Sequence, residues 1–161
     1  PLYSSAASDV YKRQLLMLLF SIQSFSQIVI DDVGEGWKKN VEKSLEVIQK
    51  VDSSKYDIVL KHCKRIGFWN NKFSTTEGND VILISKQDIQ SGNINNLSAI
   101  IIHESKHLYY RNNNIFLDER DEEILCYQYE LDFLKKIPLV ENWLIKHCEN
   151  MIKYYRSLKQ Q

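Results

Sequence analysis

The chain has no excess of charge of either sign, because 21 Lys and Arg residues balance 21 Asp and Glu residues. Proteins that bind nucleic acid without regard to its sequence need an excess of basic residues, so this kind of binding is excluded. The sequence also lacks the cluster of basic residues that holds a protein on an anionic membrane surface. We therefore expect neither nucleic acid nor a membrane surface as a partner.

Proline and glycine are scarce, with two prolines and five glycines among 161 residues, whereas 43% of the residues are hydrophobic. This composition excludes a disordered chain and a collagen-like chain. The length suits one ordinary domain with a single hydrophobic core. We therefore expect one folded domain, which we place at residues 27–161.

Cysteine is also rare, and the three cysteines, Cys63, Cys126 and Cys148, show no C-x-x-C spacing. A zinc ribbon is therefore excluded. In an exported protein, three cysteines allow one disulfide and leave one thiol over. We expect the pair Cys63–Cys148, because Cys126 falls in a helix that we expect to contribute to the functional site.

No hydrophobic run is long enough to cross a membrane as a helix, which takes about 20 residues. The run Leu15–Ile22 follows Lys12-Arg13 and precedes Ser24-Phe25-Ser26, which is the layout of a secretory signal peptide. We expect cleavage near Gln27 and export to the periplasm or the medium, and a buried first strand or helix is the alternative. Residues 1–10 show no periodicity and are interpreted as a leader that is not native.

Hydrophobic residues recur at helical spacing in the first part of the predicted domain, at Trp37, Val41, Leu45, Ile48 and Val51. This spacing predicts an amphipathic helix. The runs 56–60 and 80–85 are rich in aliphatic and β-branched residues and predict two strands, and 73–76 predicts a short additional strand.

The last part of the sequence predicts three helices, over about 96–110, 118–136 and 140–158. Asparagines precede the first as possible caps, and Pro138 separates the second from the third. The predicted fold class is therefore α+β. It consists of an N-terminal helix, a small antiparallel sheet of two to four strands, and three C-terminal helices.

One motif points to chemistry, because His103-Glu104-Ser105-Lys106-His107 matches H-E-x-x-H and falls inside a predicted helix. Residues four apart on a helix share a face, so both imidazoles can bind one zinc ion, with room for a third ligand and a water molecule. Glu104 then stands beside the ion as a general base. The alternative is that both histidines are buried for structural reasons.

The third ligand is expected on the next helix, where three acids are candidates: Glu119, Glu122 and Glu123. Glu123 shares a helix face with Cys126, Tyr127 and Glu130, which directs its carboxylate inward. We favour Glu123, with Glu122 as the second choice. For each of the three acids, the alternative is a solvated acidic start of a helix.

The H-E-x-x-H motif followed by Glu123-x-x-Cys126 resembles the zincin metallopeptidases whose third zinc ligand is a glutamate, over about residues 83–134. The resemblance implies a zinc peptidase with a peptide or protein substrate. It also implies that a strand before the motif helix lies at the edge of the sheet and binds the substrate backbone. Val81–Ile84 stands at the corresponding place in the sequence.

A phenol near the metal can donate a hydrogen bond to the oxyanion that forms during hydrolysis, so Tyr127 is a candidate catalytic residue. Tyr110 is a weaker candidate, and packing is the alternative for both. His62 and His147 have no partner at ligand spacing and are interpreted as structural. Two other functions stay open: an exported zinc-binding module without turnover, and a helical module in which the motif binds no metal.

Overall fold

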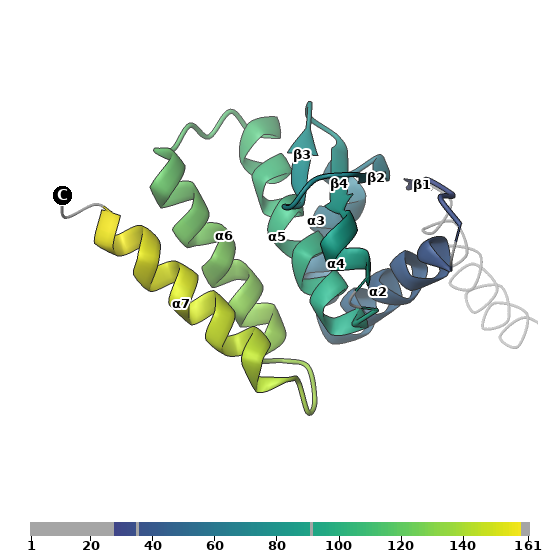
Figure 1. The fold of residues 1–161 in the computed structure, drawn as a ribbon. Helices are drawn as coiled ribbons and strands as arrows, with labels where there is room; N and C mark the ends of the chain where they lie inside the picture. The colour runs from purple at the N-terminus through teal and green to yellow at the C-terminus, as the bar shows by residue number, and fades with distance from the viewer. Residues whose placement is uncertain (1–27, 35, 91, 159–161) are drawn as a thin grey trace, which may run out of the picture.

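The computed structural model describes residues 28–34, 36–90 and 92–158, so the predicted leader, signal peptide and cleavage near Gln27 lie outside the described residues. Within these ranges, helices and a small sheet surround one central helix, α5 (Ile94–Asn112) (Figure 1). The predicted α+β class is confirmed. None of the helices in the described ranges combines the length and hydrophobicity needed to cross a membrane.

Helix α2 (Trp37–Val51) is the predicted N-terminal amphipathic helix, and it packs against α5. Trp37, Val41, Leu45 and Ile48 are all buried, as their helical spacing predicts. The helix begins directly after Gly36, which has a φ of 77°. Glycine adopts this left-handed conformation without the steric penalty of a Cβ atom.

Residues 56–60 form part of helix α3 (Ser53–His62), so the strand predicted there is wrong. The Asp52 side chain caps this helix by accepting a hydrogen bond from the backbone N–H of Lys55. Tyr56 and Val59 are buried and lie three residues apart, which places them on one helix face. A short run of apolar residues fits either structure, and the cap together with this packing favours the helix.

The sheet contains β1 (Val29–Ile30), β2 (Arg65–Trp69), β3 (Thr75–Glu77) and β4 (Val81–Ser85) in the order β1-β2-β4-β3. Strand β2 pairs in parallel with both β1 and β4, and β3 pairs antiparallel with β4. The sheet is therefore mixed, not antiparallel as predicted. Helices α2 and α3 form the crossover between the parallel strands β1 and β2, and β3 lies between β2 and β4 in the chain and runs opposite to β4, so that β4 is parallel to β2.

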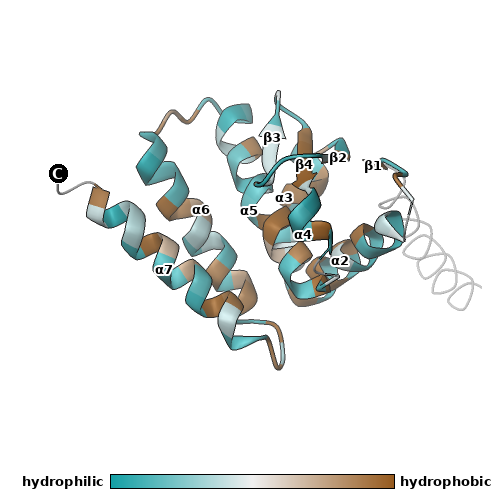
Figure 2. Ribbon diagram, in the orientation of Figure 1, coloured by the Kyte–Doolittle hydropathy of each residue, from teal (hydrophilic) through white to brown (hydrophobic). Residues whose placement is uncertain are grey.

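Strand β4 lies between β2 and β3, so Val81–Ile84 is not the edge strand that we expected. Ile82 and Ile84 of this strand are fully buried, as suits an interior position. The edge of the sheet on this side is β3. Figure 2 shows hydrophobic residues on β4 and along parts of α5, where the main core lies.

Helices α6 (Glu119–Leu134) and α7 (Asn142–Leu158) form a hairpin on the side of α5 that faces away from the sheet (Figure 1). Both agree with the predicted helices within a few residues. A five-residue helix, α4 (Lys86–Gln90), connects β4 toward α5.

The three cysteines are all buried as free thiols, so the predicted Cys63–Cys148 disulfide is wrong. Cys63 follows α3 beside the sheet, whereas Cys148 lies on α7. Helices α5 and α6 separate these two places (Figure 1).

Candidate metal centre

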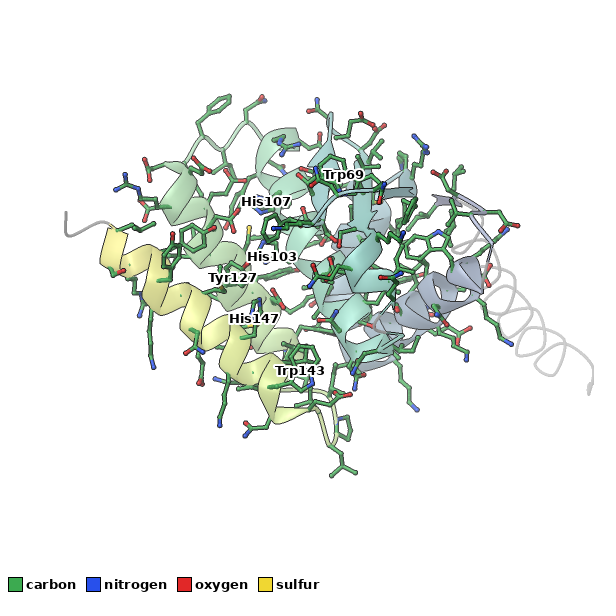
Figure 3. All side chains as sticks on the ribbon, in the orientation of Figure 1. Trp69, His103, His107, Tyr127, Trp143 and His147 are labelled. Atoms are coloured by element: carbon green, nitrogen blue, oxygen red, sulfur yellow. The ribbon has the colours of Figure 1, made fainter. Side chains whose placement is uncertain are left out.

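Helix α5 carries both histidines of the motif on the face that meets α6 (Figure 3). The helix is capped by Asn93, whose side chain accepts a hydrogen bond from the backbone N–H of Asn96. His103 and His107 lie one turn apart, and their Nε2 atoms are 3.3 Å from each other. The two nitrogens therefore face one common point in space.

The carboxylate of Glu123 on α6 reaches the same point. Its Oε2 atom lies 3.5 Å from Nε2 of His103, and its Oε1 atom lies 3.4 Å from Nε2 of His107. The structure thus brings together the three predicted metal ligands from two helices. Two imidazole nitrogens and a carboxylate form a donor set that suits zinc and leaves a coordination position open.

Each histidine is also bound on its other ring nitrogen by a carboxylate. Oε2 of Glu130 lies 3.0 Å from Nδ1 of His103, and Oε1 of Glu122 lies 2.6 Å from Nδ1 of His107. With a proton on each Nδ1 atom donating to these acids, Nε2 is the nitrogen that each ring presents to a metal. The same pairing of carboxylate, histidine and metal fixes ring orientation in known zinc sites.

These contacts distinguish Glu119, Glu122 and Glu123, the three candidates that the sequence left open for the third ligand. Glu122 contacts Nδ1 of His107, whereas Glu123 faces both Nε2 atoms, so the contacts favour Glu123 over Glu122 as the candidate third ligand. Glu119 is exposed at the start of α6. It lines a cavity beside the cluster that His103, His107 and Glu123 form. The role of Glu130 was missed, although its place on the Glu123 face of α6 was the available signal.

Cys126 is a further possible donor, because ligand atoms of His103, His107 and Cys126 all lie within 4.8 Å of one another. Burial raises the pKa of its thiol far above the usual range, and the carboxylates of Glu123 and Glu122 raise it further. The thiol is therefore protonated, whereas the Glu123 carboxylate is already charged. Binding of a cation at the thiol therefore requires release of a proton, which binding at the Glu123 carboxylate does not.

The cluster is arranged to hold positive charge. Burial by itself lowers the pKa of His103, but the carboxylates of Glu123 and Glu130 outweigh it and raise this pKa to about 10. Burial raises the pKa of Glu123, but both histidines counter it and lower that pKa to about 2. A divalent cation can replace the protons that otherwise balance these buried acids.

Glu104 follows His103 on α5 and is buried, with 6% of its surface exposed. Burial raises the pKa of its carboxyl, although the two histidines oppose that shift. The side chain lines the same cavity as the cluster. A carboxylate with a raised pKa has the higher proton affinity that a general base requires.

A cavity of about 820 Å³ opens over the cluster and separates the sheet edge from the α6–α7 hairpin. On the sheet side it is lined by Phe73, by Ser74 and by residues of β3. Strand β3, and not β4, contributes to the lining of the cavity.

Tyr127 and His147 lie on the hairpin side of this cavity (Figure 3). The ring centroid of Tyr127 is 4.4 Å from that of His103 and 5.9 Å from that of His147. His147 was interpreted as structural, yet it shares the cavity wall with Met151 and Tyr155. Their spacing of four residues along α7 was a signal for this common face.

His62, the other histidine interpreted as structural, lies outside this cavity. It is buried, and its ring packs edge-on against Tyr109 at a centroid distance of 5.5 Å.

Compared with protein-family models, curated proteins and solved structures, the chain matches none.

Proposed function

We propose that the protein is a zinc-dependent peptidase of the zincin type, with His103, His107 and Glu123 as zinc ligands. The observation that carries this proposal is that the two Nε2 atoms lie 3.3 Å apart and each lies 3.4–3.5 Å from an oxygen of the Glu123 carboxylate, in a cavity that Glu104 also lines. The carboxylates on both outer histidine nitrogens add support, because an isolated pair of structural histidines does not require them.

Bound zinc supplies Lewis acidity, which polarises a carbonyl group and lowers the pKa of a coordinated water molecule. The chain's own contribution to the reaction is Glu104, which takes a proton from the attacking water and passes it to the leaving amine. Tyr127, whose ring packs against His103, is the candidate hydrogen-bond donor to the oxyanion.

The proposed substrate is an extended peptide that lies along the outer edge of β3. A strand at the edge of a sheet has backbone groups with which an added strand can pair. Strand β3 lines the cavity over the cluster, so a peptide paired with it passes close to Glu104.

The decisive experiment combines metal analysis with hydrolysis of a peptide library. We expect one zinc per chain, lost on dialysis from His103→Ala and from His107→Ala. Glu104→Gln should keep zinc but lose hydrolysis by at least the ~10²–10⁴-fold expected for a lost general base. Glu123→Ala should weaken zinc binding itself.

Glu149→Gln is the matched control, because Glu149 is exposed on α7 outside the cavity. It should leave zinc content and hydrolysis unchanged. The assignment of roles is wrong if Glu104→Gln loses zinc while Glu123→Ala retains it.

A zinc-binding module without turnover is the second candidate, and the position of Cys126 favours it. If Cys126 joined His103, His107 and Glu123, four protein ligands would close the coordination sphere, as in structural zinc sites. Cobalt substitution distinguishes the two functions, since a thiolate ligand gives an intense near-ultraviolet absorption band. A band that Cys126→Ala removes, in a protein that cleaves no peptide, would support the module.

A further inference from the structure

Two side chains at the C-terminal end of α5 tie this helix to the turn between β3 and β4. Nη1 of Arg111 donates to the backbone carbonyl of Gly78 at 2.7 Å, and Nη2 donates to Oγ1 of Thr76 at 2.5 Å. Nδ2 of Asn112 donates to the backbone carbonyl of Asn79 at 2.8 Å. The sheet edge and the motif helix are therefore directly connected.

Arg111 connects the helix that carries the motif histidines to strand β3 and the turn after it. It lies four residues after His107, so both side chains rise from the same face of α5 one turn apart, and both line the cavity. The planar guanidinium donates to two acceptors at once, which fixes direction as well as distance. A lysine at this position has a single ammonium group and holds the turn less rigidly.

Strand β3 needs such support because it is three residues long and pairs with β4 on one side. The segment before it is held by Ser74, whose hydroxyl donates to Asp88 at 2.7 Å. Arg111 holds the other end through the Gly78 carbonyl and the Thr76 side chain. Neither acceptor belongs to the β3 backbone, so the backbone of the strand is left for a peptide.

We propose that Arg111 is a positioning residue that sets the register between an extended peptide on β3 and the metal centre. This inference rests on the proposed peptidase function. A long peptide depends on where β3 lies, whereas a minimal substrate contacts only the metal and Glu104. Loss of the Arg111 hydrogen bonds to Gly78 and Thr76 should therefore weaken the binding of long substrates selectively.

The test compares Arg111→Met with the wild type, both loaded with zinc, on two substrates with the same scissile bond. One is an extended octapeptide, and the other is a blocked dipeptide amide. Arg111→Met should raise KM for the octapeptide about tenfold or more, the order expected for lost charged hydrogen bonds. The kcat for the octapeptide and all constants for the dipeptide should change less than about twofold, while Arg111→Lys should recover part of the loss.

Arg120→Met is the matched control, because Arg120 also donates to a backbone carbonyl, that of Leu158, but lies outside the cavity. It should leave both substrates unaffected. Thr76→Val removes one acceptor without changing the helix, so it serves if Arg111→Met does not fold, and it should shift KM in the same direction.

The role of Arg111 would be refuted if Arg111→Met raised KM for both substrates by the same factor, or for neither substrate. The peptidase function would remain intact in both cases. A wild-type protein that holds zinc but cleaves neither substrate would contradict the peptidase function, and this inference with it.

Discussion

At the scale of single residues, the proposed metal site includes two acids that contact the outer nitrogens of the histidines and are not themselves proposed as ligands. Glu130 is buried, with 5% of its surface exposed, and its carboxylate holds Nδ1 of His103. Glu122 does the same for His107. These contacts keep a proton on each Nδ1 atom, so the proton that a metal displaces is the one on Nε2.

Glu130→Gln tests the role of the Glu130 carboxylate, because the amide keeps the size of the side chain and an acceptor oxygen but removes the charge. We expect zinc affinity to fall by about 10–100-fold, the usual effect of losing a partner of a metal-bound histidine. Competition with a chromophoric chelator measures the affinity directly. If Glu130→Gln and Glu149→Gln both bound zinc as tightly as the wild type, Glu130 would be a packing residue only.

At the scale of elements, Asp52 joins three helices. It follows α2, caps α3 through the Lys55 backbone N–H, and accepts a hydrogen bond at 2.8 Å from Lys136, which lies just after α6. Burial raises the pKa of this carboxyl, but the hydrogen bonds from Lys136, Ser54 and Lys55 outweigh burial and lower it to about 2. The charged form therefore stabilises the folded chain.

The lowered pKa of Asp52 predicts a specific dependence of stability on pH. The stabilisation is fully present above the unfolded pKa of about 4 and is lost as pH falls toward about 2. Asp52→Asn should lower the free energy of unfolding at pH 7 by about 1–2 kcal/mol and flatten its change between pH 4 and 2. Chemical denaturation across this range measures both effects.

Asp57→Asn provides the comparison, because Asp57 is exposed on the same helix. A wild type that loses no more stability below pH 4 than Asp52→Asn does would refute the predicted role of Asp52.

The elements also show what a sequence can and cannot predict. Periodicity sufficed for α2, which repeats its apolar face over several turns, whereas the three long C-terminal helices were predicted from capping residues and from the break at Pro138. It failed at 56–60, where one short run fits two structures, and it missed β2, which is five residues long and contains Gly67. Strand order and direction depend on contacts between distant segments, so no local pattern predicted that β4 is interior.

In the candidate site, too, the features that depend on one helix were predictable and those that depend on contacts between helices were not. His103, Glu104 and His107 were predictable because helical geometry alone relates them. The position of Glu123 beside them required α6 to pack on α5 in one particular register, and the cavity position of His147 required α7 to pack on α6. These relations arise from tertiary packing, which spacing along one helix does not contain.

At the scale of the whole molecule, the candidate ligands belong to two different bodies of the fold. His103 and His107 lie on α5, which packs with the sheet and α2, whereas Glu123 belongs to the α6–α7 hairpin (Figure 3). Away from the cluster, Glu141 accepts hydrogen bonds from Asn93 and Asn95 and holds the hairpin loop to the start of α5. A metal would add a further link to those that α5–α6 packing and the His103–Glu130 and His107–Glu122 contacts already provide.

Zinc should therefore stabilise the protein as a whole. At a free zinc concentration of 100 times Kd, linkage predicts about 2.7 kcal/mol, visible as a higher Tm that a chelator reverses. Amide hydrogen exchange should slow more in α6 and α7 than in α2. His103→Ala should show neither change, and an equal rise in its Tm would mean that zinc acts elsewhere.

The exposed segment 113–118 between α5 and α6 gives this arrangement a further consequence. In entropic terms, a metal held by residues on both sides of that segment is a crosslink that closes a loop, as a disulfide would. The three buried thiols provide no such bond. The crosslink would be reversible and would depend on the concentration of one ion. Zinc scarcity would therefore shorten the lifetime of the folded chain and also abolish the proposed activity.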